Sequence, residues 1–302
     1  MKRLSTALLA VAGAMPAAAQ RTVHAPLAAQ LPSETRALAM GGTTAASRDA
    51  AAALGNPALA GAATIAALAV ARYGGNARGG ALASSSTVGV IGLGVAASYL
   101  DYGAGFAGYA RLSNDVVWRD GPGSGASLAA AFALSTTVKG MRWGAAATYL
   151  EERVDVERAS VIALTVGMAR DAFLWGTSLG VAVQNLGPSL HLAGEKVPLP
   201  ARLAVGLSRS VFPRLSWLDI ALAGGVAVRR DGLVSGSLGG EFAWVPIEGV
   251  SVALRGGARR PELRAQRPMT TGLGVAIDRF ALDYAWEQLR AGGAHRVGLR
   301  IR

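Results

Sequence analysis

Residue types that could carry out acid–base or nucleophilic chemistry are sparse in this 302-residue chain. It has no cysteine, and its histidines, His24, His191 and His295, have no acidic partner at a readable spacing. Hydrolytic catalysis needs such a base beside its nucleophile, and no Gly-Xaa-Ser-Xaa-Gly element stands between a predicted strand and helix. The glycines at 89–94 precede no helix and form no phosphate loop. We therefore expect no enzyme activity, no cofactor and no metal site.

The first residues predict export. Lys2 and Arg3 precede an apolar stretch over residues 4–14, and three alanines at 17–19 supply a cleavage site. These are the parts of a secretory signal peptide, and the apolar stretch is shorter than the roughly 20 residues that cross a membrane. We expect residues 1–19 to be removed, with cleavage after Ala19.

Charge offers a binding chemistry. The net charge of +11 falls to +9 when Lys2 and Arg3 leave with the signal, and the other lysines are only Lys139 and Lys196. Arginine binds carboxylates and phosphates through two parallel hydrogen bonds, which an ammonium group cannot do. Export argues against nucleic acid, so the expected partners are outer-membrane lipid and lipopolysaccharide. A codon bias towards Ala, Gly and Arg explains the same composition.

The elements that must position these groups are strands. Val234, Leu238, Phe242 and Trp244 alternate with small or polar residues in "LVSGSLGGEFAW", and "FALDYAWEQ" and "HRVGLRIR" alternate in the same way. A period of two is typical of a strand with one apolar face. Strands are predicted at 64–72, 79–87, 90–102, 125–137, 142–154, 159–170, 173–183, 201–210, 216–228, 233–244, 249–258, 270–277, 280–288 and 295–302. Glycines inside them are expected to relieve curvature.

Alternation alone fits either a soluble sandwich or a membrane barrel. Three features favour the barrel: strands near ten residues long, aromatic residues near strand ends, and connections that alternate between short and long. Tight turns at Lys139, Arg170 and Asp278 interleave with long segments at 103–124, 184–200 and 259–269. The sequence therefore predicts an all-β, transmembrane antiparallel barrel of about 14 strands over 64–302, in the outer membrane, with both ends on the periplasmic side.

The segment before the barrel, residues 20–63, is predicted to be an N-terminal arm and a luminal plug. Thr43 or Thr44 could cap a helix that runs through the alanines to Leu54, with Asp49 in its early turns, and "GNP" at 55–57 would end it. So short a helix is unstable alone and needs a wall to lie against. The inside of the barrel is the expected wall.

Strand parity also predicts which charged side chains face the lumen. If the aromatic faces meet lipid, the opposite faces carry charge inward, where it costs less than on the lipid face. Asp283 or Glu287 is expected to pair with Arg296 or Arg300 on the next strand. An apolar pocket is placed near Leu100, Tyr102 and Phe106. The lumen candidates are Glu152, Glu241, Arg255, Asp283, Glu287, Arg296 and Arg300.

Certain motifs resemble those of a known group. "RALAMGG" followed by "NPALAG" is similar to the N-terminal signature of the FadL and PorV superfamily of outer-membrane barrels. "VQNLGPSL" and "KVPLPARLAVGL" resemble mid-barrel elements of its PorV and PorQ branch. The resemblance implies a fourteen-stranded barrel with an N-terminal plug. Its plug positions here are Met40, Gly41, Gly42, Asn56, Pro57 and Ala58. Asn56 could either gate a path or merely cap a turn.

Two functions stay open. The FadL-like reading is a passive channel for fatty-acid-like molecules, gated by the plug, which predicts an apolar pocket beside the plug and a wall opening near 79–102. The PorV-like reading is an accessory of type IX protein secretion or envelope assembly, which predicts a filled lumen. The long segment 103–125 could hold a ligand or a secretion-machinery protein, or fold over the barrel mouth.

Overall fold

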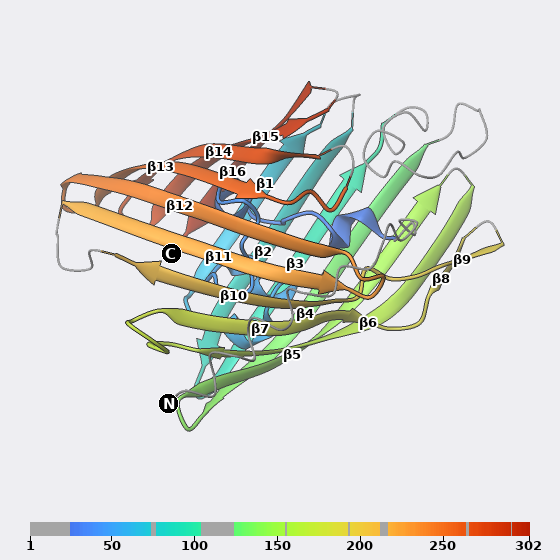
Figure 1. Ribbon diagram of the computed structural model, residues 1–302, viewed down its shortest axis with the longest axis horizontal. Helices are drawn as coiled ribbons and strands as arrows, with labels where there is room; N and C mark the ends of the chain where they lie inside the picture. Colours follow the sequence, from blue (N-terminus) through green and yellow to red (C-terminus); the bar gives the residue numbers. More distant parts are fainter. Residues whose placement is uncertain are drawn as a thin grey trace.

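The computed structural model describes residues 25–73, 77–103, 124–154, 156–192, 194–211, 217–263, 266–290 and 292–302. These residues form a closed antiparallel barrel of 14 strands (Figure 1). The predicted signal peptide, His24 and Phe106 lie outside the described residues. The barrel strands are β1 (Ile65–Arg72), β2 (Arg78–Val88), β3 (Ile91–Asp101), β4 (Gly125–Val138), β5 (Met141–Val154), β6 (Glu157–Arg170), β7 (Ser178–Leu186), β10 (Arg202–Ser210), β11 (Leu218–Arg229), β12 (Val234–Ile247), β13 (Val250–Arg259), β14 (Gln266–Ile277), β15 (Phe280–Leu289) and β16 (Gly292–Ile301).

Closure comes from the pairing of the first and last strands. β1 lies antiparallel to β16 from Ala66 opposite Ile301 to Arg72 opposite His295, so neither strand is left with an unpaired edge. The predicted 14-stranded barrel is confirmed, and its strand bounds hold to within a few residues at most positions. The sequence missed a small hairpin, β8 (Leu190–Leu192) and β9 (Glu195–Val197), which lies outside the barrel sheet.

The two faces of the wall differ as the period-two pattern requires. Along the strands, exposed and buried residues alternate, and many large apolar side chains are exposed. Leu68, Leu82, Phe132, Leu254 and Leu282 are each more than half exposed on the outward face. No helix among the described residues is long and apolar enough to span a membrane. The apolar outward face therefore suits contact with lipid.

The segment that precedes β1 lies inside the barrel as a plug. Its helical parts are η2 (Leu27–Ala29), α2 (Thr35–Ala39), η3 (Ala50–Ala53) and η4 (Pro57–Leu59). In Figure 1 this blue chain crosses the space enclosed by the strands.

The predicted single helix from Thr43 or Thr44 to Leu54 is wrong. Asp49 is extended, and only the four-residue turn η3 follows it. The physical reason lies in two side-chain hydrogen bonds: the carbonyl of Ala45 accepts one from Asn56 within the plug, and the carbonyl of Ala46 accepts one from Ser208 on β10 of the wall. Carbonyls engaged in this way are no longer free to bond within a helix. A helix so short gains too little to compete.

Glycines on the inward face let the plug approach the wall backbone. A Cβ on Gly167 would lie 2.0 Å from Oδ1 of Asn56, and one on Gly180 would lie 1.8 Å from the carbonyl oxygen of Ala45. Comparable overlaps occur on other strands all round the barrel. The expectation that strand glycines serve curvature is therefore incomplete, because these positions must lack a side chain for the plug to fit. The further positions are Gly92, Gly144, Gly239, Gly257, Gly272 and Gly298.

The β8–β9 hairpin is closed at its base by the mid-barrel motifs. Asn185 has a left-handed backbone, with φ of 56°, and its side chain donates to the carbonyl of Pro200 at 3.2 Å. Its own N–H donates to Oγ1 of Thr165 at 3.2 Å. Asparagine tolerates this conformation better than most residues. The Asn-Leu-Gly and Leu-Pro elements are thus joined where the chain leaves and rejoins the wall.

Substitution of Gly167 by alanine tests the fit between plug and wall. The added Cβ must displace Asn56, so we expect G167A to lower the free energy of unfolding by about 1–3 kcal/mol, as overpacking does. The measurement is the urea midpoint of the refolded barrel. The control is G256A, because a Cβ on Gly256 meets nothing within 4 Å. Equal midpoints for the two variants would show that the plug does not press on the wall there.

Candidate functional site: the interface between plug and wall

Hydroxyl side chains of the wall satisfy the backbone of the plug. Oγ of Ser127 accepts from the N–H of Ala28 at 2.9 Å, and Oγ of Ser135 donates to the carbonyl of Ala60 at 2.6 Å. Oγ1 of Thr270 does both, since it accepts from Gly41 and donates to Ala39. An irregular buried backbone needs such partners. The wall is therefore matched to the plug group by group.

Asn56 joins three parts of the molecule. Its side-chain amide donates to the carbonyls of Ala45, at 2.8 Å, and of Met168 on β6, at 3.1 Å. Its Oδ1 accepts from the N–H of Ala58 at 3.1 Å, and Pro57 occupies the first position of η4. Asn56 is fully buried. It therefore caps the turn and also fastens the plug to the wall.

The Met-Gly-Gly element ends α2. The N–H of Gly42 bonds to the carbonyl of Ala37 and the N–H of Gly41 to that of Leu38, which is the Schellman arrangement. Gly41 and Gly42 have φ of 76° and 80°, a region that favours glycine. A Cβ on Gly41 would also lie 2.9 Å from the carbonyl oxygen of Leu238 on β12. The element is thus fixed both by the helix end and by the wall.

A chain of ion pairs connects the plug to β12, β13, β15 and β16. Arg36 of α2 donates two hydrogen bonds of 2.9 Å to Glu241 and lies 3.6 Å from Asp49. Arg255 pairs with Glu241 and, at 2.7 Å, with Asp283. With Arg300, which follows Asp283, the chain contains three acids that alternate with three arginines.

The last member of that chain is Arg300, which pairs with Asp283 at 2.5 Å. This is one of the cross-strand pairings that the sequence suggested. The other expected pairings differ: Glu287 pairs with Arg259 of β13, and Arg296 donates to the carbonyl of Pro32 and to the hydroxyl of Tyr73. Like Glu241 and Arg255, all of these charged groups are buried inside the barrel.

Glu152 stands apart from the arginines. It is fully buried on β5, and its carboxylate accepts from the hydroxyl of Tyr102 and, at 3.3 Å, from the N–H of Leu27. Around it the lumen is apolar. One cluster includes Leu27, Leu31, Leu100 and Tyr102, and a second joins Leu190 and Leu192 of the hairpin to Ala25 and Ala28 of the plug. Side chains therefore fill the position predicted for an apolar pocket.

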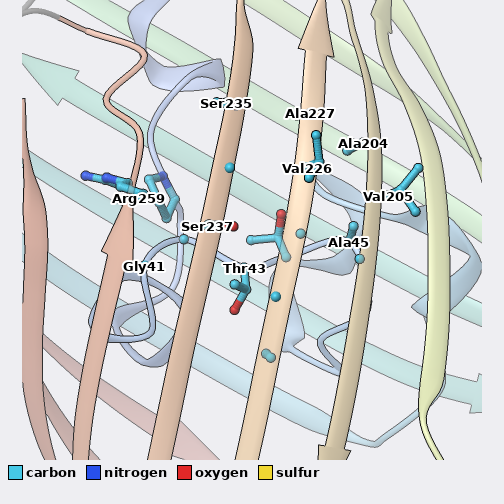
Figure 2. A pocket seen from close by; sticks show the side chains of 18 of the residues that line it. Gly41, Thr43, Ala45, Ala204, Val205, Val226, Ala227, Ser235, Ser237 and Arg259 are labelled. Carbon is cyan, nitrogen blue, oxygen red and sulfur yellow. The ribbon is translucent and has the colours of Figure 1, made fainter. Parts of the chain in front are cut away.

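The gaps between plug and wall are small. The one in Figure 2 has a volume of about 80 Å³ and lies between plug residues 41–47 and strands β10 to β12. Figure 2 shows Gly41, Thr43 and Ala45 behind the strands that carry Ala204 and Ala227. Two other gaps among the described residues measure about 40 and 10 Å³. For comparison, an apolar cavity of roughly 150 Å³ holds one benzene molecule.

A larger hollow lies at the end of the barrel where β1 begins. It has a volume of about 510 Å³, and its lining includes Arg36, Arg48, Asp219, Glu241 and Arg302. The lumen therefore has a polar hollow at this end and apolar clusters at the other, with the plug between them.

The wall is continuous where an opening was expected. β2 stays in register with β1 and β3 along its length. The ladder is irregular elsewhere, between Leu164 and Val166 of β6, near Ile247 of β12 and near Gln266 of β14. The expectation of an opening near 79–102 is therefore not met among the described residues.

Sequence reasoning missed the plug side of this interface. Glu34, Arg36 and Asp49 are buried or half-buried ionisable residues of the plug, and nothing in the surrounding sequence marks them as groups that contact the lumen wall. The inward serines and the glycines opposite the plug also gave no separate signal, because serine and glycine are common on strands of every kind. His191 and His295 are both exposed, and Nδ1 of His295 lies 2.8 Å from the hydroxyl of Tyr284.

Comparison with known proteins gives a fold but no close relative. No protein-family model matches the chain, and no curated protein matches it. Among solved structures, the chain is similar to the CymD monoaromatic hydrocarbon channel, with a TM-score of 0.59 and 11% identity over 88% of this chain and 95% of that one. It is also similar to the toluene transporter TodX of Pseudomonas putida, with a TM-score of 0.56 and 12% identity over 88% and 96%.

A FadL homologue from Pseudomonas aeruginosa gives a TM-score of 0.58 with 9% identity, over 93% of this chain and 99% of that chain. The chain has the fold of the FadL-type channels. At these identities the likeness concerns architecture: the fourteen-stranded closed barrel with the helical turns of its N-terminal segment inside.

Substitution of Asn56 by serine separates capping from fastening. Serine is a good N-cap, but its side chain is too short to donate to the carbonyls of Ala45 and Met168. We therefore expect N56S to lower the free energy of plug opening by about 1–3 kcal/mol, close to the decrease in N56A. The measurement is the labelling rate of a thiol at A37C, because Ala37 is buried beside the 40 Å³ gap and the chain has no cysteine. Equal A37C labelling rates with and without the N56S substitution would show that Asn56 acts only as a helix cap.

The plug should loosen as pH rises. Burial, and after it the charge of Asp49, raises the pKa of Glu34 in the plug to about 8, against the opposing effects of the Ala51 N–H, Arg300 and Arg36. An acid whose pKa is raised on folding stabilises the fold below its unfolded pKa, and that stability is lost as pH rises towards the folded pKa. We expect A37C labelling to accelerate, relative to an E34Q variant, as pH rises from about 4.5 to about 8, which are the ordinary and the raised pKa of Glu34. Parallel pH profiles would contradict this assignment.

Proposed function

We propose that this protein is an outer-membrane channel for the passive uptake of hydrophobic small molecules, gated by its N-terminal plug. The proposal rests on the fold shared with CymD, TodX and the FadL homologue, of which CymD is described as a monoaromatic hydrocarbon channel and TodX as a toluene transporter. The apolar outward face supports a membrane location. The predicted signal peptide supports export, and monoaromatic compounds or fatty acids are the proposed substrates.

One observation carries the gating part: the plug fills the lumen. The three small gaps between plug and wall, of about 80, 40 and 10 Å³, are smaller than the cavity of roughly 150 Å³ that holds benzene, and the hollow of about 510 Å³ lies at the end where β1 begins. A hydrophobic molecule could therefore pass only if part of the plug moved. The plug also meets the conditions for a movable part, because side-chain hydrogen bonds, ion pairs and apolar contacts hold it, and residues 25–63 contribute no strand to the barrel sheet.

A removable disulfide tests the gate. A Cβ on Gly94 of β3 would lie 3.6 Å from the Cβ of Ala53 in the plug, within the range of about 3.5–4.5 Å that a disulfide spans. The variant A53C/G94C therefore locks plug to wall when oxidised. The same Cβ lies 3.6 Å from that of Ala133 on β4, so G94C/A133C joins two wall strands and leaves the plug free.

The readout is uptake of labelled toluene and oleate by Gram-negative cells that lack their own outer-membrane route for these compounds. We expect oxidation to block uptake through A53C/G94C and reduction to restore it, while G94C/A133C transports in both states. Uptake through the locked plug would overturn gating. Uptake by wild type no greater than by cells without the protein would overturn the transport proposal.

The filled lumen also favours a second candidate, a PorV- or PorQ-like accessory of type IX secretion or envelope assembly. Such a protein needs a rigid barrel and an exposed surface, and no path through the lumen. It predicts that oxidised A53C/G94C keeps full biological activity in a secretion assay, whereas a channel would be inactive. The locked variant thus separates the two candidates.

A further inference from the structure

An arginine cluster lies on the outward face of the wall, outside the lumen. Leu150 and Glu152 of β5 are fully buried inside the barrel. Tyr149, Glu151 and Arg153 alternate with them along the strand and therefore face outward. The side chain of Glu151 is nevertheless only 3% exposed, while those of Arg153 and Arg158 are 53% and 58% exposed. A carboxylate is therefore covered by two arginines on the face that is otherwise apolar.

The contacts within this cluster fix the guanidinium groups. Arg153 donates to Glu151 through Nε, and Arg158 donates to the same carboxylate at 2.6 Å. The hydroxyl of Tyr149 donates to Glu151 at 2.5 Å. Two arginines share one carboxylate, so a charge of +1 remains, and each guanidinium keeps further N–H donors beyond these contacts.

The cluster belongs to a longer row of charges. Arg72 of β1 stands opposite Arg78 of β2, which stands opposite Asp101 of β3. The row continues through Ala126 of β4 to Arg153 and Arg158, which are again opposite each other. Like charges directly opposite on neighbouring strands repel. Glu151 already lies between the arginines of the second pair, and the four arginines of the row outnumber Asp101 and Glu151, so the row favours a further anion beside it.

The position of the row indicates which anion. Its members lie within one or two residues of the ends of their strands, at the end of the barrel opposite to the start of β1. Arginine on a lipid face is costly at the membrane centre and tolerated at the interface, where lipid headgroups lie. From the row towards the middle of the strands, the outward face carries large apolar or aromatic side chains, such as Ile162, Leu82 and Tyr99.

We propose that Arg153 and Arg158, held by Glu151, bind the phosphate groups of a lipopolysaccharide molecule seated against the outer wall of the barrel, with Arg72 and Arg78 as a second contact. The guanidinium geometry suits phosphate because two parallel N–H groups meet two oxygens. Acyl chains would lie along the apolar strands below. This proposal rests on the proposed outer-membrane location, because that location decides which lipid surrounds this end of the barrel.

The test is a binding titration of the detergent-purified full chain, followed by native mass spectrometry. The ligands are lipopolysaccharide, the same lipid with its phosphates removed, and inorganic phosphate. We expect wild type to bind the phosphorylated lipid and R153Q/R158Q to bind it at least tenfold more weakly. R153K/R158K should fall between them, because lysine keeps the charge and loses the paired hydrogen bonds.

The control variant is R170Q/R209Q. It removes two exposed arginines near the C-terminal ends of β6 and β10, at the other end of the barrel from the row, and should bind like wild type. Each variant is first shown to be folded by its heat-dependent gel migration. Equal affinity of R153Q/R158Q and wild type would overturn the proposal, as would equal binding of the dephosphorylated lipid. Binding of inorganic phosphate with the same affinity would overturn the lipid as occupant.

Discussion

The plug can lie in this barrel only because the wall lacks side chains where the plug crosses it. At Gly144, Gly167 and Gly180 an added Cβ would overlap plug atoms at 2.4 Å or less. This close approach brings plug carbonyls and N–H groups within reach of inward hydroxyls such as those of Ser135 and Thr270. Several backbone groups of this irregular buried chain thereby find partners on the wall. The hydrogen bonds, the ion pairs and the closure of the lumen all follow from this fit.

The charged and apolar parts of the lumen divide the work of holding the plug. The chain of ion pairs from Asp49 through Arg36, Glu241, Arg255 and Asp283 to Arg300 holds α2 against one side of the barrel. Buried ion pairs add little net stability, but removal of one partner leaves a costly unpaired charge. They therefore favour one position of the plug over others. The clusters near the β8–β9 hairpin stabilise the other end by apolar burial, which has no such directionality.

The sequence was sufficient for the wall and insufficient for the plug. A period of two sorts the side chains of every strand into inward and outward sets, which is why parity alone separates Leu150 and Glu152 from Glu151. The partner of a lumen charge in an ion pair depends on the register across several strands. The pairing of Glu287 on β15 with Arg259 on β13 could therefore not be predicted from adjacent strands. The plug has no such period. The alanines at 50–53 favour a helix locally, but the hydrogen bonds from Asn56 of the plug to Ala45 and from Ser208 of the wall to Ala46 decide the backbone that precedes them.

The anchors of the plug are unevenly placed, and this determines which part can move first. α2 is held by the bidentate contact of Arg36 with Glu241, and η4 by Asn56 and the bond of Ser135 to Ala60. Residues 41–47 run between these anchors beside the 80 Å³ gap, the largest of the three small gaps described between plug and wall. Packing is weakest where neighbouring atoms are missing, so local opening costs least there. Local opening of the plug would therefore begin beside β10 to β12, between the two anchored ends, and would leave the ion pairs of α2 intact.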